Sequence, residues 1–367
     1  MKSDTSFTLV LSGGGLKGLA HIGVLRALEE RGLRPSLVVG SSMGSMIAAA
    51  WASGMSVDEM TVRALEVRRR DVFQVAHVDM ALRRMKAPAV YRPEPLERLI
   101  DSLVGNRTFL ELHRTLLVNT VDLNSGMQVL WGLPGLRDVR VADAVFASCA
   151  LPGIFPPKQI GERFYVDGAV TANLPVRIAA AVGRGPLIAV NVAATSVYRA
   201  DVETQGFAAI YIRGLEIVMQ VQIANQLRNW DGPPVLLIEP EVEQISMFAF
   251  HQTAELIRKG YTATSEALDL YDGQLERIEK GIHPRRNVVV RVNQRRCVGC
   301  GLCIARAPDV FERDPSGTAR VIAPNQVWSP LDGSYVRECP THAIEVTEVP
   351  IVRKLSGEPP AAHSMAE

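Results

Sequence analysis

The sequence has almost no excess charge of either sign. Its 40 lysines and arginines are balanced by 39 aspartates and glutamates, which leaves a formal net charge of +1. Because a protein that binds nucleic acid through bulk electrostatics carries a large positive charge, we expect no nucleic-acid partner. The sequence also lacks an uncharged apolar run long enough to cross a bilayer, since the best candidate, residues 178–195, is interrupted by Arg184 and Pro186. We therefore expect no transmembrane segment.

Cysteine is also scarce, and its distribution is uneven. Of the five cysteines, four come after residue 296, which indicates a metal site in a reducing compartment instead of a disulfide framework. Residues 1–6 lead directly into a strand-like segment, without the charged and long apolar regions of a secretory signal. We therefore expect a cytoplasmic protein, with the option of a peripheral position at a membrane.

The N-terminal region contains two strand-like segments, each followed by a glycine-rich turn. Residues 7–11 and 37–39 predict buried parallel strands, and residues 19–31 between them predict an amphipathic helix. This βαβ pattern, together with an apolar content of 47%, predicts an α/β fold with a doubly wound, mainly parallel sheet.

The second turn has the G-x-S-x-G pattern of a nucleophile elbow. Gly40 and Gly44 allow a sharp bend, and Ser42 stands at the N-terminus of a predicted helix. The unpaired N–H groups at that end can stabilise a developing negative charge. The same pattern also occurs as a simple turn of small residues between a strand and a helix, so alone it leaves both interpretations open.

The first turn contains G-x-G-x-x-G at Gly13, Gly15 and Gly18. A dinucleotide site would also need an acidic residue at the end of the second strand, and a P-loop would need G-K-[ST]; neither follows here. Consecutive glycines can instead point backbone N–H groups at one oxygen. Since adjacent parallel strands bring their C-terminal turns together, we expect Gly13, Gly14 and Gly15 to lie beside Ser42 as an oxyanion hole.

A third motif is Asp167-Gly168-Ala169, at the end of the strand-like residues 163–166. Alone, an aspartate next to a glycine is a common turn.

Further along, residues 207–227 predict a long helix, residues 235–240 predict the last strand of the sheet, and residues 252–271 predict its last helix.

In this order the motifs resemble those of the patatin-like phospholipase family, over about residues 7–271. Residues 147–157 and 173–176 also look like that family. The resemblance implies a three-layer α/β fold and a Ser-Asp dyad, with Ser42 as nucleophile, Asp167 as base and Gly13, Gly14 and Gly15 as the oxyanion hole. It implies supporting roles for the remaining motif residues, which are Lys17, Gly18, Gly40, Gly44 and Gly168. D-G-A stands here where D-G-G is also frequent in the family.

The histidines agree with a dyad. In a Ser-His-Asp enzyme of the α/β-hydrolase type a histidine follows the acid in the chain. His251 lies in a phenylalanine-rich run that suggests a core or capping role, while His283 and His342 lie outside the predicted hydrolase domain. Lys17 is either structural or faces a substrate phosphate, and Cys149 is expected to be a small buried residue.

Residues 66–92 combine basic and apolar side chains. They could form a cap over the active site that touches anionic lipid headgroups. The alternative is a solvated helical excursion with ordinary surface charge.

The C-terminal cysteines are spaced as C-x2-C-x2-C, with a remote C-P. This is the bacterial ferredoxin pattern, and it predicts one 4Fe–4S cluster. Zinc, which usually takes paired C-x2-C knuckles, fits less well. Residues 288–349 resemble single-cluster bacterial ferredoxins, and Ala307 stands where a two-cluster protein has a further cysteine. The predicted ligands are Cys297, Cys300, Cys303 and Cys339.

The predicted organisation is a hydrolase domain over 1–271, a linker over 272–287, a small α+β ferredoxin-like domain over 288–349 and a flexible tail over 350–367. The leading interpretation is a serine acyl-ester hydrolase acting on a lipid or acyl-ester substrate, with a fused 4Fe–4S module that serves a redox or electron-transfer role toward a possible redox partner protein. The alternative is an electron-transfer protein whose N-terminal part binds lipid or a partner without significant catalysis.

Overall fold

The computed structural model describes residues 6–76, 88–193, 206–246 and 248–349. The chain divides into two compact units, residues 1–284 and 285–367. Each unit has its own hydrophobic core. The predicted tail over residues 350–367 lies outside the described residues.

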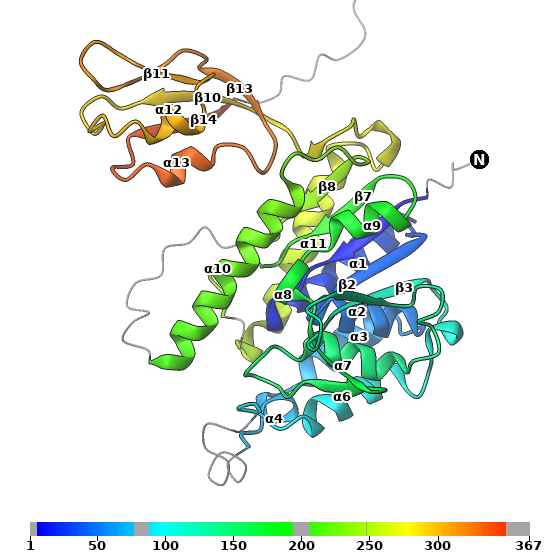
Figure 1. The fold of residues 1–367 in the computed structure, drawn as a ribbon. Coiled ribbons are helices and arrows are strands. Elements are labelled where there is room, and N and C mark those ends of the chain that lie inside the picture. The colour runs from blue at the N-terminus through cyan, green and yellow to red at the C-terminus, as the bar shows by residue number, and fades with distance from the viewer. Residues whose placement is uncertain (1–5, 77–87, 194–205, 247, 350–367) are drawn as a thin grey trace, which may run out of the picture. The chain divides into compact units, whose positions relative to one another are not determined.

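The first unit is organised around one sheet (Figure 1). Its described strands are β1 (Thr8–Leu11), β2 (Leu37–Ser41), β3 (Leu116–Asp122), β4 (Gln128–Trp131), β5 (Lys158–Ile160), β6 (Arg163–Asp167), β7 (Leu187–Val190), β8 (Val235–Ile238) and β9 (Ile282–His283). The strand order is β5-β6-β3-β2-β1-β7-β8-β9, and β4 pairs with β3. The strands from β3 to β9 in this order are parallel, while β4, β5 and β6 pair antiparallel.

The helices of this unit connect and cover the strands. They are α1 (Ala20–Glu30), α2 (Met43–Ala52), α3 (Val57–Glu66), α4 (Arg69–Val72), α6 (Glu94–Val104), α7 (Val141–Cys149), α8 (Ala169–Ala172), α9 (Val176–Val182), α10 (Phe207–Leu227) and α11 (Thr253–Asp269). Short 3-10 turns are η1 (Gly15–Leu19), η3 (Phe109–Glu111), η5 (Phe250–Gln252) and η6 (Leu275–Arg277). The α1 helix packs on α11, and α2 packs on α6 and α7.

The central strands are buried along their whole length. Every residue of β1, β2, β3, β7 and β8 is buried, as expected of strands whose two faces are both covered by helices. The prediction of an α/β fold with a mainly parallel central sheet is therefore confirmed.

The sheet extends further along the chain than the sequence suggested. Residues 235–240 were expected to hold its last strand, but β9 adds to β8, with Ile282 opposite Val235. Leu275, Ile278 and Ile282 are buried. These three apolar side chains hold most of the expected linker, residues 272–287, against the first unit, and β10 of the second unit begins at Arg286.

The segment expected as a cap is packed at both of its ends. The Phe73 ring lies 4.9 Å from that of Tyr91 and 5.8 Å from that of Phe155, and the Tyr91 N–H donates to the Ile154 carbonyl. The middle of the segment, residues 77–87, lies outside the described residues.

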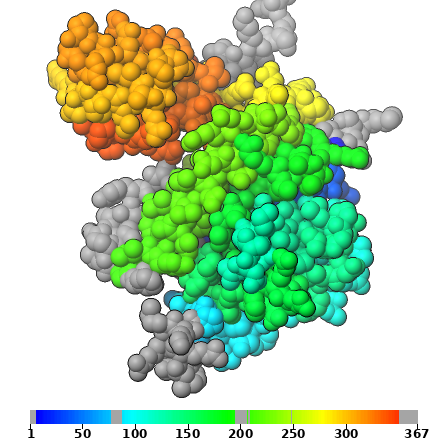
Figure 2. All heavy atoms as spheres, in the orientation of Figure 1, coloured from blue at the N-terminus to red at the C-terminus, as the bar shows by residue number. Residues whose placement is uncertain are grey.

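Helix α10 lies on the face of the first unit seen in Figure 2 and has several exposed apolar side chains. Ile210, Ile217, Val218 and Val221 are each about half exposed. In the described parts of the chain, none of the helices combines the length and the apolar character that crossing a membrane requires.

The second unit is a small α+β domain. A three-stranded antiparallel sheet has the order β13-β10-β14, and β11 and β12 form a second antiparallel pair. Its elements are β10 (Arg286–Val292), α12 (Leu302–Arg306), β11 (Phe311–Arg313), β12 (Ala319–Val321), β13 (Asn325–Trp328), α13 (Ser334–Glu338) and β14 (Ile344–Val349). Its core contains Val290, Phe311, Trp328 and Tyr335.

Candidate active site and metal centre

Ser42 lies on a sharp turn between β2 and α2. Its backbone has φ 52° and ψ −129°, a conformation that few residues other than glycine adopt. The turn requires close backbone packing, because a side chain at Gly44 would come within 2.4 Å of the Leu11 carbonyl oxygen. Backbone strain of this kind clusters at active sites and ligand-binding positions.

Asp167 lies beside Ser42 at the end of β6. The Ser42 hydroxyl donates a 2.7 Å hydrogen bond to Oδ2 of Asp167, and the Ala169 N–H donates to Oδ1 at 2.8 Å. Asp167 is 1% exposed. Burial raises the pKa of Asp167 to about 7, against the opposing effects of the Ala169 and Ser42 hydrogen bonds. The carboxyl group can therefore gain or lose a proton near neutral pH.

The first glycine turn lies against Ser42, as the pairing of β1 with β2 predicts. A side chain at Gly13 would come within 2.7 Å of the Ser42 Cβ, so only glycine fits there. The Gly13 N–H is already bound, because it donates to Oδ1 of Asn173 at 3.0 Å and to the Asn173 carbonyl at 3.3 Å. In the described residues we find no such partner for the N–H groups of Gly14 and Gly15.

Three buried polar side chains that the sequence analysis assigned no role hold these turns together. Asn173 links the Gly13 turn to the end of α8, where its amide also donates to the Gly13 carbonyl at 3.4 Å. The Ser42 N–H donates to the Ser148 hydroxyl at 2.9 Å, and that hydroxyl donates to the Asn119 carbonyl at 2.7 Å. The Asn119 amide donates to the Ala172 carbonyl at 2.8 Å. All three residues are 0% exposed. Ser148 and Asn173 lie in the two further blocks that resemble the family, whereas the only sequence signal of Asn119 is a polar residue inside an apolar strand.

The supporting motif residues occupy tightly packed positions. Lys17 is 4% exposed, so its stem is enclosed by protein. Three glycines make contacts that a Cβ would break: Gly18 against Met43, Gly40 against Ser45 and Gly168 against Asn119.

The Ser42 hydroxyl donates to Asp167, while His21 and His283 of the first unit make their hydrogen bonds to other groups. His21 is buried and its Nε2 bonds to the Ser12 carbonyl at 2.9 Å, while burial lowers its pKa to about 4. His283 bonds to Tyr271 and to the Glu279 carbonyl. His251 is exposed, so the core position suggested for it is wrong. Cys149 is buried as expected.

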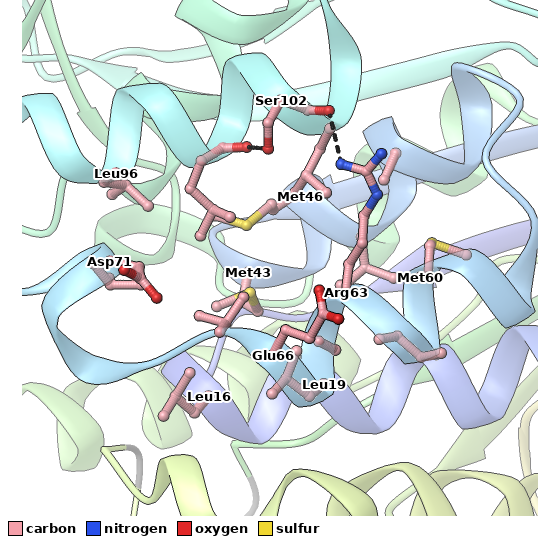
Figure 3. Close-up of a pocket in the computed structure, with 18 of the residues that line it drawn as sticks. Leu16, Leu19, Met43, Met46, Met60, Arg63, Glu66, Asp71, Leu96 and Ser102 are labelled. Atoms are coloured by element: carbon pink, nitrogen blue, oxygen red, sulfur yellow. Dashed lines mark hydrogen bonds between the residues drawn. The ribbon is translucent and has the colours of Figure 1, made fainter.

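An apolar cavity of about 270 Å³ adjoins the two turns (Figure 3). Leu16, which follows Gly15, and Met43, which follows Ser42, both line it. The rest of its wall comes from Leu19 of η1, Ile22 of α1, the helices α2, α3, α4 and α6, and Val67 and Phe250. The cavity thus lies in the helical layer next to both turns, with Leu16 and Met43 in its wall, while Ser42 and Asp167 are not among the lining residues.

In the second unit, one small cavity is lined by all four clustered cysteines, Cys297, Cys300, Cys303 and Cys339. Backbone N–H groups point at two of the sulfurs, from Ala319 to Cys297 at 3.5 Å and from Ala343 to Cys339 at 3.3 Å.

The loop that carries the first three cysteines is shaped by glycine and fixed by Arg313. Gly299 and Gly301 have φ of 68° and 76°, which lets the loop turn between successive cysteines. Arg313 donates to the carbonyls of Gly299 and Gly317 at 3.1 and 2.7 Å. Sulfurs that share one cavity and accept backbone N–H groups fit an iron–sulfur cluster. Within the described residues, however, no group of three or more side chains is already close enough to hold a single metal ion.

Comparison with known proteins assigns both units. Residues 9–180 match the model of the patatin-like phospholipase family, and residues 290–346 match that of the 4Fe-4S single cluster domain. An uncharacterised NTE family protein of Mycobacterium tuberculosis is 28% identical over 281 residues, which cover 72% of this chain and 46% of that protein. The triacylglycerol lipase ptl3 of Schizosaccharomyces pombe is 31% identical over 197 residues, covering 46% of this chain and 40% of the lipase.

The match to VipD of Legionella pneumophila, a solved structure, covers 73% of this chain and 67% of VipD, with 15% identity and a TM-score of 0.43. The chain spans less than half the length of the first curated relatives that it matches. The family models account for the two motif sets in the two units: this chain belongs to the patatin-like phospholipase family and carries a 4Fe-4S single cluster domain in its C-terminal unit.

Proposed function

We propose that the chain is a lipid acyl-ester hydrolase in which Ser42 and Asp167 act as a catalytic dyad. The observation that carries this proposal is the 2.7 Å hydrogen bond from the Ser42 hydroxyl to a buried carboxyl group with a pKa of about 7. A base with a pKa near the working pH suits proton transfer, and the residue that follows Ser42 on α2, Met43, lines the apolar cavity. Relatives that include a triacylglycerol lipase support a lipid substrate.

The proposed reaction is acyl transfer in two steps. Asp167 takes the Ser42 proton as the Ser42 oxygen bonds to the ester carbonyl carbon, and the proton then passes to the leaving alcohol as the ester C–O bond breaks. Water attacks the resulting acyl-serine, with Asp167 again accepting a proton and returning it to Ser42. The products are the free fatty acid and the alcohol.

The oxyanion hole of this proposal uses the first glycine turn. The N–H groups of Gly14 and Gly15 are the donors of this turn without a protein partner in the described residues, and the η1 turn that begins at Gly15 packs on α2. Gly13 would not be a donor, because its N–H is bound to Asn173. Its role would be to leave room for Ser42, which a side chain at this position would contact. Lys17 would support the turn from inside the protein, since its burial favours a structural role over contact with a substrate phosphate.

We further propose that Cys297, Cys300, Cys303 and Cys339 hold one 4Fe–4S cluster. The shared cavity and the N–H groups aimed at sulfur support this assignment. When bound, such a cluster supplies one-electron transfer, so a redox partner protein is part of the proposal. Free thiols of this kind persist in a reducing compartment, which favours a cytoplasmic protein, peripheral to a membrane when it meets lipid.

Hydrolysis assays of the full chain test the dyad. Ser42→Ala and Asp167→Asn should each lower kcat for a short-chain ester by at least about a thousandfold, and the double variant should lose little more. The exposed controls Ser36→Ala and Asp138→Asn should keep the activity of the parent. Absence of ester hydrolysis in the parent chain would instead favour the electron-transfer alternative, in which this unit binds lipid without turnover.

A further inference from the structure

We infer that the apolar cavity beside Ser42 binds a single fatty acyl chain, and that Ala50 sets how long a chain it accepts. The inference rests on the proposed function, because it places the ester carbonyl at Ser42. It goes further by identifying which part of a lipid enters the protein and which residue limits its length.

The cavity follows one face of α2 away from Ser42. Met43, Met46, Ile47 and Ala50 all line it, and their spacing of three, four and seven residues puts them on the same side of a helix. From Met43 to Ala50 the helix rises by about 10 Å. Leu16 of η1 lines the same cavity just after the glycine turn. A chain whose carbonyl lies at Ser42 would therefore enter at Met43 and run toward Ala50.

The lining suits an aliphatic ligand with no charge. Three charged side chains lie at the α3 and α4 side. Two are engaged within the protein: Arg63 donates to Glu59 at 2.9 Å and to the Ser102 carbonyl at 3.3 Å (Figure 3), and Asp71 accepts from the Arg68 N–H at 2.9 Å. The third, Glu66, is exposed to solvent. Apolar side chains make up most of the remaining wall. Burial of methylene groups against such a wall is favourable by about 0.8 kcal/mol each.

The size of the cavity favours one chain instead of two. Its volume of about 270 Å³ lies just below the range of about 300–1,000 Å³ that is typical of pockets for drug-sized ligands. Three of the lining residues are methionines, Met43, Met46 and Met60. Their unbranched, flexible side chains can adjust to acyl chains of somewhat different shape. The second chain of a diacyl lipid would remain outside this cavity.

Two small residues line the cavity, and of its lining residues on α2 Ala50 lies farthest along the helix from Ser42. Ala50 is 1% exposed on α2 and Ala64 is 7% exposed on α3, and both line the cavity. A larger side chain at either position would occupy space that the distal part of the acyl chain would otherwise fill. Butyryl chains end before Ala50, so they should be unaffected.

The test compares p-nitrophenyl butyrate, octanoate and palmitate as substrates of the full chain. We expect Ala50→Leu to lower kcat/KM for the palmitate and octanoate esters by about tenfold or more relative to butyrate. Ala181→Leu, the same change at an exposed alanine of α9, should leave the ratio unchanged. Ala64→Leu provides the same test from α3 if Ala50→Leu does not fold. An unchanged chain-length profile in folded Ala50→Leu and Ala64→Leu would overturn the inference while leaving the hydrolase proposal in place.

A binding measurement separates the two proposals. Ser42→Ala should bind octanoate, and the added Ala50→Leu substitution should weaken that binding by about tenfold. Octanoate binding that depends on Ala50 in a chain that hydrolyses no ester would support the pocket and refute the hydrolase. Octanoate binding that is insensitive to both Ala50→Leu and Ala64→Leu would refute the pocket.

Discussion

The Ser42 hydroxyl and the Asp167 carboxyl group form a hydrogen bond of 2.7 Å at the junction of two turns that lie 125 residues apart in the chain. Asp167 is almost completely buried, and that burial raises its pKa to about 7. The same desolvation that penalises the charged carboxylate also makes it a stronger base toward Ser42. Reactivity and stability are therefore expected to depend on the ionisation of this one group.

The rate of hydrolysis should depend on pH through Asp167. Because the proposed base must be ionised to accept the Ser42 proton, kcat/KM should rise with pH and level off above about 7, the pKa of Asp167 in the folded protein. A pH profile measured on p-nitrophenyl butyrate checks this. A rate that already levels off near pH 4 would show that the ionisation of Asp167 does not limit the reaction.

The stability of the folded protein should depend on pH in the opposite direction, through the same group. A folded-state pKa of about 7, raised above the ordinary value of 3.8, stabilises the folded protein below pH 4, and this contribution is lost as pH rises through 7. That difference corresponds to an effect on the order of 4 kcal/mol. Asp167→Asn removes the titration, so its Tm relative to the parent should increase between about pH 5 and pH 8. The exposed control Asp138→Asn should show no such trend, and a flat Tm difference for Asp167→Asn would contradict the assigned pKa.

Asn173 should act as a positioning residue. Its side chain accepts from the Gly13 N–H and donates to the Gly13 carbonyl, which fixes the turn that carries Gly14 and Gly15. We expect Asn173→Ala to lower kcat by roughly ten- to a hundredfold with little change in KM, because loss of an oxyanion donor itself costs about a hundred- to a thousandfold. The exposed Asn225→Ala is the matched control. A change in KM alone would assign Asn173 to substrate binding instead.

The metal centre makes a prediction that is independent of hydrolysis. Anaerobically purified protein should contain about four irons and four sulfides per chain, as one cubane held by four thiolates requires. Cys339→Ser should lower the iron content or convert the cluster, whereas Cys149→Ser, at a buried cysteine of the first unit, should leave the visible absorption unchanged. One zinc per chain without sulfide would refute the iron–sulfur assignment.

The sequence predicted the local elements better than their tertiary relations. The predicted helix over 207–227 matches α10 residue for residue, because it carries its own apolar pattern. The meeting of the first two turns also followed, since adjacent parallel strands place their C-terminal ends side by side.

What escaped prediction depends on contacts between distant segments. Residues 272–287 are polar and charged overall, so the three spaced apolar side chains that dock β9 onto β8 were not recognised as a strand signal. The pairing of Asn173 with Gly13 joins residues 160 positions apart, and no local pattern encodes such a bond. For the same reason the sequence analysis expected all three glycines of the first turn to offer N–H donors to an oxyanion, although the Gly13 N–H is bound to Asn173 in the structure.

The most direct test of the proposed dyad is to map where a fluorophosphonate probe attaches to the full chain. Mass spectrometry of digested protein should place the adduct on Ser42 in the parent and in Cys149→Ser. Labelling of Asp167→Asn should be slowed by at least about a hundredfold, because a positioned general base contributes about a hundred- to ten-thousandfold. An adduct on another residue, or labelling of Asp167→Asn at the parent's rate, would contradict the Ser42–Asp167 mechanism.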